Sequence, residues 1–327
     1  RAPRRRRVWQ LVERRQRVVV GFRRHPFPVQ RGQALGVVLD RRRVIAPCLQ
    51  SPREQSRVSS LDAYPRLLEN AAANKAPDKE DLFRFKWNGL FFLTPHKEAF
   101  MARLRIPGGQ LKSFQLREIA RVADELTTGY IQITTRANFQ IRLIQPKDSP
   151  EFLRRIQAVG LHTRGAGADN IRNLTCNPTA GIDPHELIDT LPFCHQLGQI
   201  ILNDRSFYDL PRKFNVAFDG GGLIGSVEDT NDIGVSAVKI EGDEKIPAGI
   251  YFRIKLGGAT GHKAFANDCG VLVKPEQILK VVPAMIRVYI ANGNRTDRKR
   301  ARLKHLRSEE HTSELQSRFG ISYAVFC

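Results

Sequence analysis

The chain has 327 residues, 41% of them hydrophobic and 26% charged, an ordinary globular balance that provides enough material for about two domains. No run approaches the roughly 20 apolar residues that a membrane-spanning helix requires, so a membrane protein is not expected. The formal net charge of +20 points first to a nucleic-acid partner, but the charge is unevenly spread. Residues 1–57 alone hold 16 arginines, no lysine and three acids.

Both ends of the chain have a composition unlike the rest. Residues 1–57 show no helical stripe and no sustained alternation, and the composition changes sharply near Val58. We therefore interpret this segment as translated DNA upstream of the true start, in preference to a basic arm or an arginine-rich transit peptide. Residues 307–327 (RSEEHTSELQSRFGISYAVFC) resemble a translated sequencing adapter, so we expect the gene to be cut near Leu306.

Five cysteines are present, and none of them forms a CxxC pair. Their spacing predicts neither a zinc site nor a disulfide framework, which favours a reduced, cytoplasmic location. Cys176 and Cys194 are expected in the core, whereas Cys48 and Cys327 belong to the two atypical ends.

Residues 58–97 are interpreted as an N-terminal wrap. Within them, residues 61–74 predict a short helix, and the aromatic run from Phe83 to Leu93 is expected to cover a surface without regular structure.

Residues 98–160 predict a ferredoxin-like half-domain. Strands are expected at 99–106, 130–134 and 139–144, and helices from Ser113 to a stop at Gly129 and over 149–159. This β-α-β-β-α order is most of a split βαβ plait.

Alternation in these strands separates an apolar face from a polar one. Leu104 and Ile106 share one face of the first strand, and Arg103 and Arg105 share the other. If helices cover the apolar face, the basic face either meets water or binds an anion, and the pattern alone leaves both open.

Residues 165–306 predict a second unit of mixed helix and strand. Strands are expected near 170–177, 213–218, 235–240 and 248–255, with helices over 185–202 and 275–292. The fold class is therefore α+β, a ferredoxin-like plait half-domain followed by an α/β domain.

Four motifs in a fixed order carry a resemblance. They are RIPGG (105–109), TTRANFQIR (134–142), NIRNLTCNP (170–178) and LPRKFNVAF (210–218). Together they resemble the sirohaem-dependent nitrite and sulfite reductases, most closely the assimilatory ferredoxin-nitrite reductases, and nearly all of 61–306 fits the N-terminal half of these enzymes. The resemblance implies an incomplete α/β sirohaem-reductase domain and a six-electron reduction of nitrite to ammonia at sirohaem coupled to a [4Fe–4S] cluster.

The resemblance also implies roles for single residues. Arg105, Arg172 and Lys213 match substrate-binding cations, and Arg136 matches an arginine that contacts the sirohaem carboxylates. Thr134 and Gln140 match neighbouring cofactor-binding positions, and Arg142 on the same polar face joins them. Because sirohaem bears eight carboxylates and the substrate is an anion, such a site needs many cations. The enzymatic interpretation therefore requires Arg105, Arg136, Arg172 and Lys213 to converge.

Asn215 is the position that discriminates between substrates. Sulfite reductases of this family usually have a second lysine two residues after the one matched by Lys213, and nitrite reductases usually have asparagine. One fewer cation suits the monoanion nitrite, so nitrite is favoured over sulfite.

The family's four cluster cysteines match nothing in this chain, so no metal ligand is assigned and the chain as written is expected to bind neither cofactor stably and to be inactive. The expected partners are ferredoxin or a similar acidic electron donor and a small inorganic anion, with neither membrane nor nucleic acid. Three alternatives remain, namely a sulfite reductase of the same family, a basic nucleic-acid-binding plait protein and a non-catalytic homologue.

Overall fold

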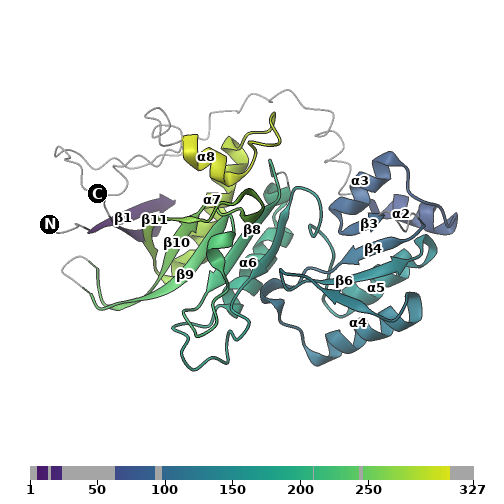
Figure 1. Ribbon diagram of the computed structural model, residues 1–327, viewed down its shortest axis with the longest axis horizontal. Helices are drawn as coiled ribbons and strands as arrows, with labels where there is room; N and C mark the ends of the chain where they lie inside the picture. The colour runs from purple at the N-terminus through teal and green to yellow at the C-terminus, as the bar shows by residue number, and fades with distance from the viewer. Residues whose placement is uncertain are drawn as a thin grey trace. The chain divides into compact units, whose positions relative to one another are not determined.

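The computed structural model describes the backbone of residues 6–13, 16–23, 63–92, 98–208, 210–242 and 246–309, and the side chains of those between 63 and 306 (Figure 1). The chain divides into two compact units. The plait unit comprises residues 45–175 and 198–214, and the six-strand unit comprises residues 1–44, 176–197 and 215–327. No helix in the described part of the chain is long and apolar enough to cross a bilayer.

The plait unit contains a four-stranded antiparallel sheet. Its strands run in the order β3 (Leu90–Phe92), β4 (Phe100–Arg103), β6 (Phe139–Ile144) and β5 (Ile131–Ile133). Its helices are α2 (Ala63–Ala72), α3 (Lys79–Trp87), α4 (Ser113–Leu126) and α5 (Ser149–Ala158). The order β4-α4-β5-β6-α5 confirms the predicted plait, and β3 occupies the edge beside β4.

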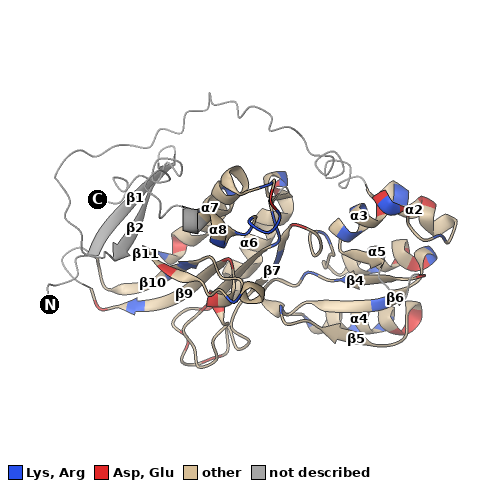
Figure 2. Ribbon diagram, turned by 45° about the horizontal axis from the view of Figure 1, so that its top comes forward, with Lys and Arg blue, Asp and Glu red and all other residues tan. Residues whose placement is uncertain are grey.

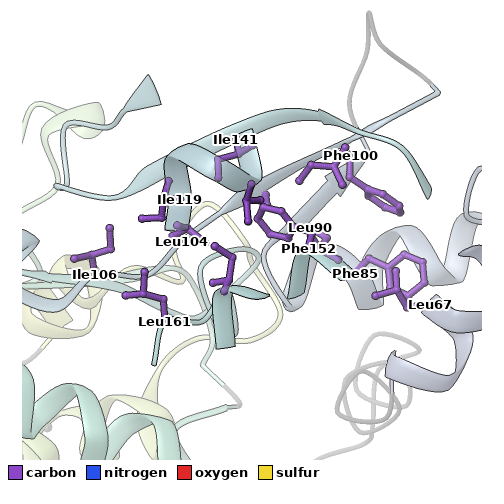
Figure 3. Packing of buried hydrophobic residues seen from close by; sticks show 14 of the residues in the cluster. Leu67, Phe85, Leu90, Phe100, Leu104, Ile106, Ile119, Ile141, Phe152 and Leu161 are labelled. Atoms are coloured by element: carbon purple, nitrogen blue, oxygen red, sulfur yellow. The ribbon is translucent and has the colours of Figure 1, made fainter. Parts of the chain in front are cut away.

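The core of the plait unit lies between the sheet and its helices (Figure 3). Leu104 and Ile141 from the sheet pack in one cluster with Ile119 of α4 and Phe152 of α5, and all four are fully buried. Gly129, at a φ of +77°, donates its N–H to the carbonyl of Ala123 at 3.0 Å, so it ends α4 as predicted. Burial of one apolar stripe on each helix therefore fixes which sheet face stays polar.

A bulge breaks the predicted alternation in β6. Ala102 pairs with Ile141 and Phe100 pairs with Ile144, so two residues of β6 oppose the single residue Met101. Leu143 adopts a φ of +63° at this point, and Ile144 takes the buried position that strict alternation gives to Leu143. In β5, which forms the sheet edge beside β6, Ile133 is 73% exposed.

The aromatic run has regular structure over its described residues, Phe83 to Phe92, contrary to prediction. The side chain of Asp78 accepts the Asp81 N–H at 2.8 Å and caps α3, whose residues Phe85 and Trp87 are buried. After Gly89, at a φ of +81°, the chain turns into β3 and pairs with β4. The aromatic residues are thus core residues of a helix and an edge strand.

The six-strand unit contains β8 (Phe214–Asp219), β9 (Ile233–Ile240), β10 (Gly249–Leu256) and β11 (Asn267–Val273), with β8 and β9 parallel and the others antiparallel. β11 was not predicted. Helix α7 (Ile278–Asn292) was predicted, and its inward residues Ile278, Val281, Val282 and Ile286 are buried. Short 3-10 turns lie at Pro107–Gly109, Pro146–Asp148, Arg205–Tyr208, Glu228–Thr230, Thr260–His262 and Pro275–Gln277, and α8 spans Leu303–Glu309.

The first strands of this unit lie within residues 1–57, the segment interpreted above as translated DNA upstream of the true start. β1 (Arg6–Glu13) pairs with β2 (Gln16–Arg23), and β2 pairs with β11. The expectation of no sustained element was therefore wrong for these residues. Residues 24–62 and 310–327, with Cys48 and Cys327, lie outside the described residues, so the interpretation of both ends stays a prediction.

Helix α6 (Leu191–Asn203) begins later than the predicted residue 185. The N–H of His185 donates to Asp183 at 2.9 Å, and the N–H of Leu187 donates to the carbonyl of Gly220 at 2.8 Å. Because these N–H groups donate to loop acceptors, the chain is not helical at residues 185–187. The helix starts where the side chain of Asp189 accepts the Leu191 N–H at 2.9 Å.

Candidate anion-binding site

Two arginines of the plait unit converge on one loop. Arg103 in β4 donates to the carbonyl of Ala166 at 3.4 Å, and Arg172 in β7 (Ile171–Thr175) donates to the same carbonyl at 3.0 Å. Arg172 also donates to the carbonyl of Ala168 at 2.6 Å. The loop of residues 163–168 therefore brings together two guanidinium groups that are 69 residues apart in sequence.

The positive charge around Arg172 is concentrated. Burial, together with the charges of Arg103, Arg212 and Arg136, lowers the pKa of Arg172 to about 10, while Asp169 opposes the shift. The pKa of Arg103 is likewise lowered by burial and by Arg142. At pH 7 these groups remain protonated, so the site carries a cluster of cations.

Arg105 is the most deeply buried of the cations, at 3% exposure. The backbone N–H of Arg105 donates to the carbonyl of His162 at 2.9 Å. Its guanidinium lies close to Gly165, where a Cβ would be 2.9 Å from Nη1. Burial lowers the pKa of Arg105 to about 10. Its Nε and Nη2 have no hydrogen-bond partner among the described residues.

The missing partners indicate the type of ligand. Elsewhere in the plait unit arginines pair with acids, as Arg66 does with Asp81 at 3.3 Å and Arg155 with Glu118 at 2.6 Å. Basic and acidic segments accordingly lie close together along the ribbon of α2 and α3 (Figure 2). The Nε atoms of Arg103 and Arg172 are buried and unpartnered among the described residues, like those of Arg105. Buried charged donors without an acceptor are costly, and an anionic ligand satisfies them.

The turn between β5 and β6 presents Arg136. The hydroxyl of Thr134 accepts the N–H groups of Arg136 at 3.3 Å and Asn138 at 3.1 Å. Asn138 accepts the Ile106 N–H at 3.0 Å, and Asn173 of β7 donates to the carbonyls of Ile106 at 2.7 Å and Arg136 at 2.8 Å. Thr134 thus shapes the turn, and the Arg136 backbone is fixed beside the strand that carries Arg172.

Gln140 and Arg142 lie on the polar sheet face. Gln140 accepts from Arg103 at 3.3 Å, and Arg142 donates to Gln132 at 2.7 Å. Gln140 therefore supports Arg103 through a direct contact, whereas Arg142 contacts Gln132 of the neighbouring strand.

Lys213 lies at the end of the plait unit, and Asn215 is the first residue after it. Lys213 is exposed, and the next residue, Phe214, donates its N–H to the carbonyl of Asn170 at 3.0 Å. Asn215 belongs to the six-strand unit, where its N–H donates to Asp232 at 2.9 Å and its side-chain amide approaches the same oxygen at 3.4 Å. Of the four cations required to converge, Arg105, Arg136 and Arg172 are linked by the loop and strand contacts above, and the relation of Lys213 to them stays a prediction.

Several residues of the site were not among the sequence candidates. Arg103 shares the polar face, and Arg212 pairs with Asp169 at 3.0 Å. Alternation had placed Arg103 beside Arg105, so that signal was available. Asn138 and Asn173 act through backbone carbonyls and N–H groups of distant segments, which no local pattern indicates.

Cysteines in the described residues do not fit an iron–sulfur cluster. Cys176 and Cys194 are buried, as predicted, and Cys269 is half-buried. A [4Fe–4S] cluster takes four cysteine thiolates, and no group of three or more His, Cys, Asp or Glu side chains in the described residues is arranged to hold a metal.

Two protein-family models match the chain. Residues 94–159 match the nitrite/sulfite reductase ferredoxin-like half domain. Residues 167–317 match the nitrite and sulphite reductase 4Fe-4S domain, and this match runs past Leu306.

Individual relatives agree with the family models. The chain is 32% identical to the assimilatory ferredoxin-dependent nitrite reductase of Haloferax mediterranei, covering 74% of this chain and 44% of that protein. It is 35% identical to the ferredoxin–nitrite reductase of Leptolyngbya laminosa, covering 77% of this chain and 49% of that protein. The chain thus spans about half the length of these relatives.

A solved structure supports the same assignment. The NirA protein of Mycobacterium tuberculosis superposes with a TM-score of 0.70 at 26% identity, covering 83% of this chain and 52% of that one. The α+β fold is thereby confirmed. The two matched domain models, these relatives and the solved structure agree. The chain belongs to the nitrite and sulfite reductase family.

Proposed function

We propose that this chain is part of a ferredoxin-dependent nitrite reductase that binds sirohaem and a small inorganic anion through its arginine cluster. The cluster comprises Arg103, Arg105, Arg136 and Arg172. The observation that carries the proposal is the set of buried guanidinium donors on Arg103, Arg105 and Arg172 that no described residue satisfies. Within the described residues none of these three forms an ion pair with a carboxylate.

The residues present fit sirohaem, whose eight carboxylates require cations. Arg136 would hold a carboxylate of the macrocycle. Arg105 and Arg172, which the resemblance assigns to substrate binding, would hold the substrate anion and would also contact carboxylates of the macrocycle. When bound, sirohaem supplies the iron at which nitrite receives six electrons. Gln140 and Arg142 would orient this polar face, and Thr134 would fix the turn that carries Arg136.

The protonation states suit anion binding. A pKa of about 10 leaves Arg105 protonated at pH 7, so it donates hydrogen bonds and stabilises negative charge on the substrate. His162, whose pKa is lowered to about 4 by burial and by Arg105, is neutral at pH 7 and adds no competing cation.

The [4Fe–4S] cluster does not fit the described residues, so no step is derived through it. We propose, as the sequence predicts, that the chain as written is inactive on its own. Ferredoxin as donor follows from the names of the two nitrite reductase relatives, and the cytoplasmic location stays a prediction.

Nitrite is favoured over sulfite by Asn215. A lysine there would add a cation beside Lys213 and would suit an anion of higher charge. In a full-length enzyme containing this chain, Asn215→Lys should raise sulfite turnover relative to nitrite turnover. An unchanged ratio would remove the argument from Asn215 and leave nitrite unpreferred over the alternative, a sulfite reductase of the same family.

Titration of the purified chain with sirohaem, followed by its absorption spectrum, tests the binding role directly. Weak binding is expected, because the chain spans about half of the relatives' length. Arg172→Met and Arg105→Met should weaken it at least about tenfold, since each removes a charge-assisted hydrogen bond. Arg154→Met is the matched control, because Arg154 is exposed and pairs with Glu151 at 2.6 Å.

Equal affinity of all three variants would contradict the proposal. Tight, salt-sensitive RNA binding that Arg172→Met weakens would instead support the nucleic-acid alternative. That alternative has little support on the sheet, where Gln132 and Gln140 stand in place of stacking aromatics.

A further inference from the structure

A buried carboxylate lies against Asn215 in the six-strand unit. Asn215 is the second residue of β8, and Asp232 directly precedes β9, the parallel neighbour of β8. The Oδ2 atom of Asp232 accepts the backbone N–H of Asn215 at 2.9 Å and lies 3.4 Å from its side-chain nitrogen, Nδ2. Both residues are buried. Asp232 therefore holds residue 215 by its backbone and by its side chain.

Arg302 cancels the charge of this carboxylate. Its Nε donates to Oδ1 of Asp232 at 3.0 Å and its Nη2 donates to Oδ2 at 2.8 Å, which makes a two-point ion pair. Arg302 is buried as well, and its Nη2 lies 3.5 Å from the carbonyl oxygen of Gly258. A Cβ at Gly258 would lie 2.4 Å from the carbonyl oxygen of Asn231, so the backbone around the pair is closely packed. The Asp232 cluster, which is Asn215, Asp232 and Arg302, thus contains a cation but has no net charge.

The contact with Asp232 determines which end of the Asn215 amide is left for a ligand. An ionised carboxylate only accepts hydrogen bonds, so the end of the amide that faces Oδ2 is the nitrogen. The other end, the carbonyl oxygen Oδ1, is buried and has no hydrogen-bond partner among the described residues. Residue 215 therefore offers an acceptor and no donor, and an acceptor does not attract the oxygen atoms of an anion.

We propose that Asp232 is a positioning residue that sets, through Asn215, the preference for a monoanion over a dianion. It holds the amide nitrogen of Asn215 and cancels the charge of Arg302, so the Asp232 cluster presents neither a donor nor a net charge to a ligand. The inference rests on the proposed function, which makes Asn215 part of substrate discrimination. It adds a second determinant of the preference for nitrite over sulfite, one that lies outside position 215.

Anion binding to a full-length enzyme containing this chain tests the proposal without turnover. The dissociation constants of nitrite and sulfite are measured from the absorption spectrum of the oxidised enzyme, with no electron donor, in mildly alkaline solution where sulfite is a dianion. Asp232→Asn keeps the shape of the side chain, but it leaves the charge of Arg302 uncancelled. The nitrite constant divided by the sulfite constant should therefore rise about tenfold.

Two further variants separate charge from general disruption. Arg302→Gln leaves the Asp232 carboxylate uncancelled, so the same ratio should fall. Asp232→Asn combined with Arg302→Gln carries neither charge, and its ratio should lie within about threefold of the parent value. Asp268→Asn is the matched control in the same unit and should leave the ratio unchanged, because Asp268 is exposed and lies 4.0 Å from its partner Arg253.

Asn215→Ala tests the orientation of the amide and keeps the charges in place. It should bind nitrite as the parent enzyme does, because the amide nitrogen faces Asp232 and not the ligand. Weaker nitrite binding by this variant would overturn the proposal, and this result decides the question if a charge variant fails to fold.

Two other outcomes would also overturn the proposal, namely an unchanged ratio in Asp232→Asn and a ratio that shifts in the same direction in both single variants. If Arg105→Met and Arg172→Met nevertheless weaken sirohaem binding, the proposed function stands and only the role of Asp232 is lost.

Discussion

Arg105 carries a positive charge inside the plait unit, and no described carboxylate balances it. An uncompensated buried charge lowers the stability of the free protein, whereas a flexible apolar side chain of similar length does not. The same charge is available to an anionic ligand. Binding and stability therefore oppose each other at this residue.

Replacing Arg105 by an uncharged residue should therefore change stability and ligand binding in opposite directions. Arg105→Met is expected to raise the free energy of unfolding of the ligand-free chain by about 2 kcal/mol while it weakens sirohaem binding. Urea denaturation checks the first effect. The exposed Arg154→Met should stay within about 0.5 kcal/mol of the parent chain, and a less stable Arg105→Met chain would show that Arg105 is satisfied internally.

His162 predicts a pH dependence. Burial and the charge of Arg105 lower its pKa from 6.5 to about 4. Between pH 6.5 and pH 4, His162 is therefore largely protonated in the unfolded chain and largely neutral in the folded chain. Stability therefore falls as the pH falls from 6.5 towards 4. Between pH 7 and pH 5 the loss from this residue is about 2 kcal/mol.

Denaturation at the two pH values isolates this contribution. His162→Gln should lose less stability between pH 7 and pH 5 than the parent chain does. The exposed His195→Gln in α6 should behave as the parent. Identical pH profiles for all three chains would remove the assigned role of His162.

Single residues differ in how far the sequence predicts them. Alternation placed Arg103 and Arg105 on one face and Ile106 on the other, and the structure agrees. It could not predict that Arg105 is buried without a partner, because the loop of residues 163–168 that covers it is distant in sequence. Asn215 illustrates the same limit, since its contact with Asp232 depends on two strands pairing.

At the scale of elements, the turn at Gly89 positions both β3 and the loop that covers the arginines. Its φ is +81°, and a Cβ there would lie 2.2 Å from the carbonyl oxygen of Thr163. Gly160, at a φ of +75°, has nothing within 4 Å of its would-be Cβ. The two glycines share a left-handed backbone and differ only in the space around them.

This pair separates steric overlap from backbone strain. Gly160→Ala should cost about 1 kcal/mol through its φ alone, and Gly89→Ala about 3 kcal/mol, because a backbone atom must also move. Thermal unfolding of both variants measures the difference. An equal loss of stability in the two variants would mean that the Thr163 carbonyl moves away from the added methyl group without a measurable free-energy penalty.

Helices and strands were predictable where they carry a local sequence pattern. They were not predictable where they form only through pairing with a strand that is distant in sequence. The helical stripe of α4 and the alternation of β5 are local signals, and both elements were predicted. β11 begins with Asn267 and Asp268, which disfavour strands, and it forms because β10 pairs with it. The bulge at Leu143 likewise arises from the register between β4 and β6.

At the scale of the whole molecule, one buried ion pair joins distant parts of the six-strand unit. Arg302 donates to both oxygens of Asp232, at 3.0 and 2.8 Å, and both residues are buried. The pair spans 70 residues of sequence and ties the segment before α8 to the start of β9. When one residue of a buried ion pair is replaced by a neutral one, the charge of the other residue is left buried without compensation.

Arg302→Met should therefore lower the stability of the six-strand unit by about 3 kcal/mol. Hydrogen exchange should quicken in β8 and β9, with less change in β4 and β6 of the plait unit. The exposed Arg300→Met should leave exchange as in the parent chain. Unchanged protection of β9 in Arg302→Met would indicate that the pair contributes nothing net.

The position of β3 has a practical consequence for anyone shortening this gene. The ferredoxin-like family match begins at residue 94, after β3 has ended at Phe92. A product that starts there would leave the outer backbone of β4 open to strands from other molecules, and it should precipitate or form fibrils. A product that starts at residue 63 keeps β3 paired with β4. Both products lack β2, the partner of β11, so a comparison of the two by light scattering isolates the effect of β3, and the longer product should aggregate less.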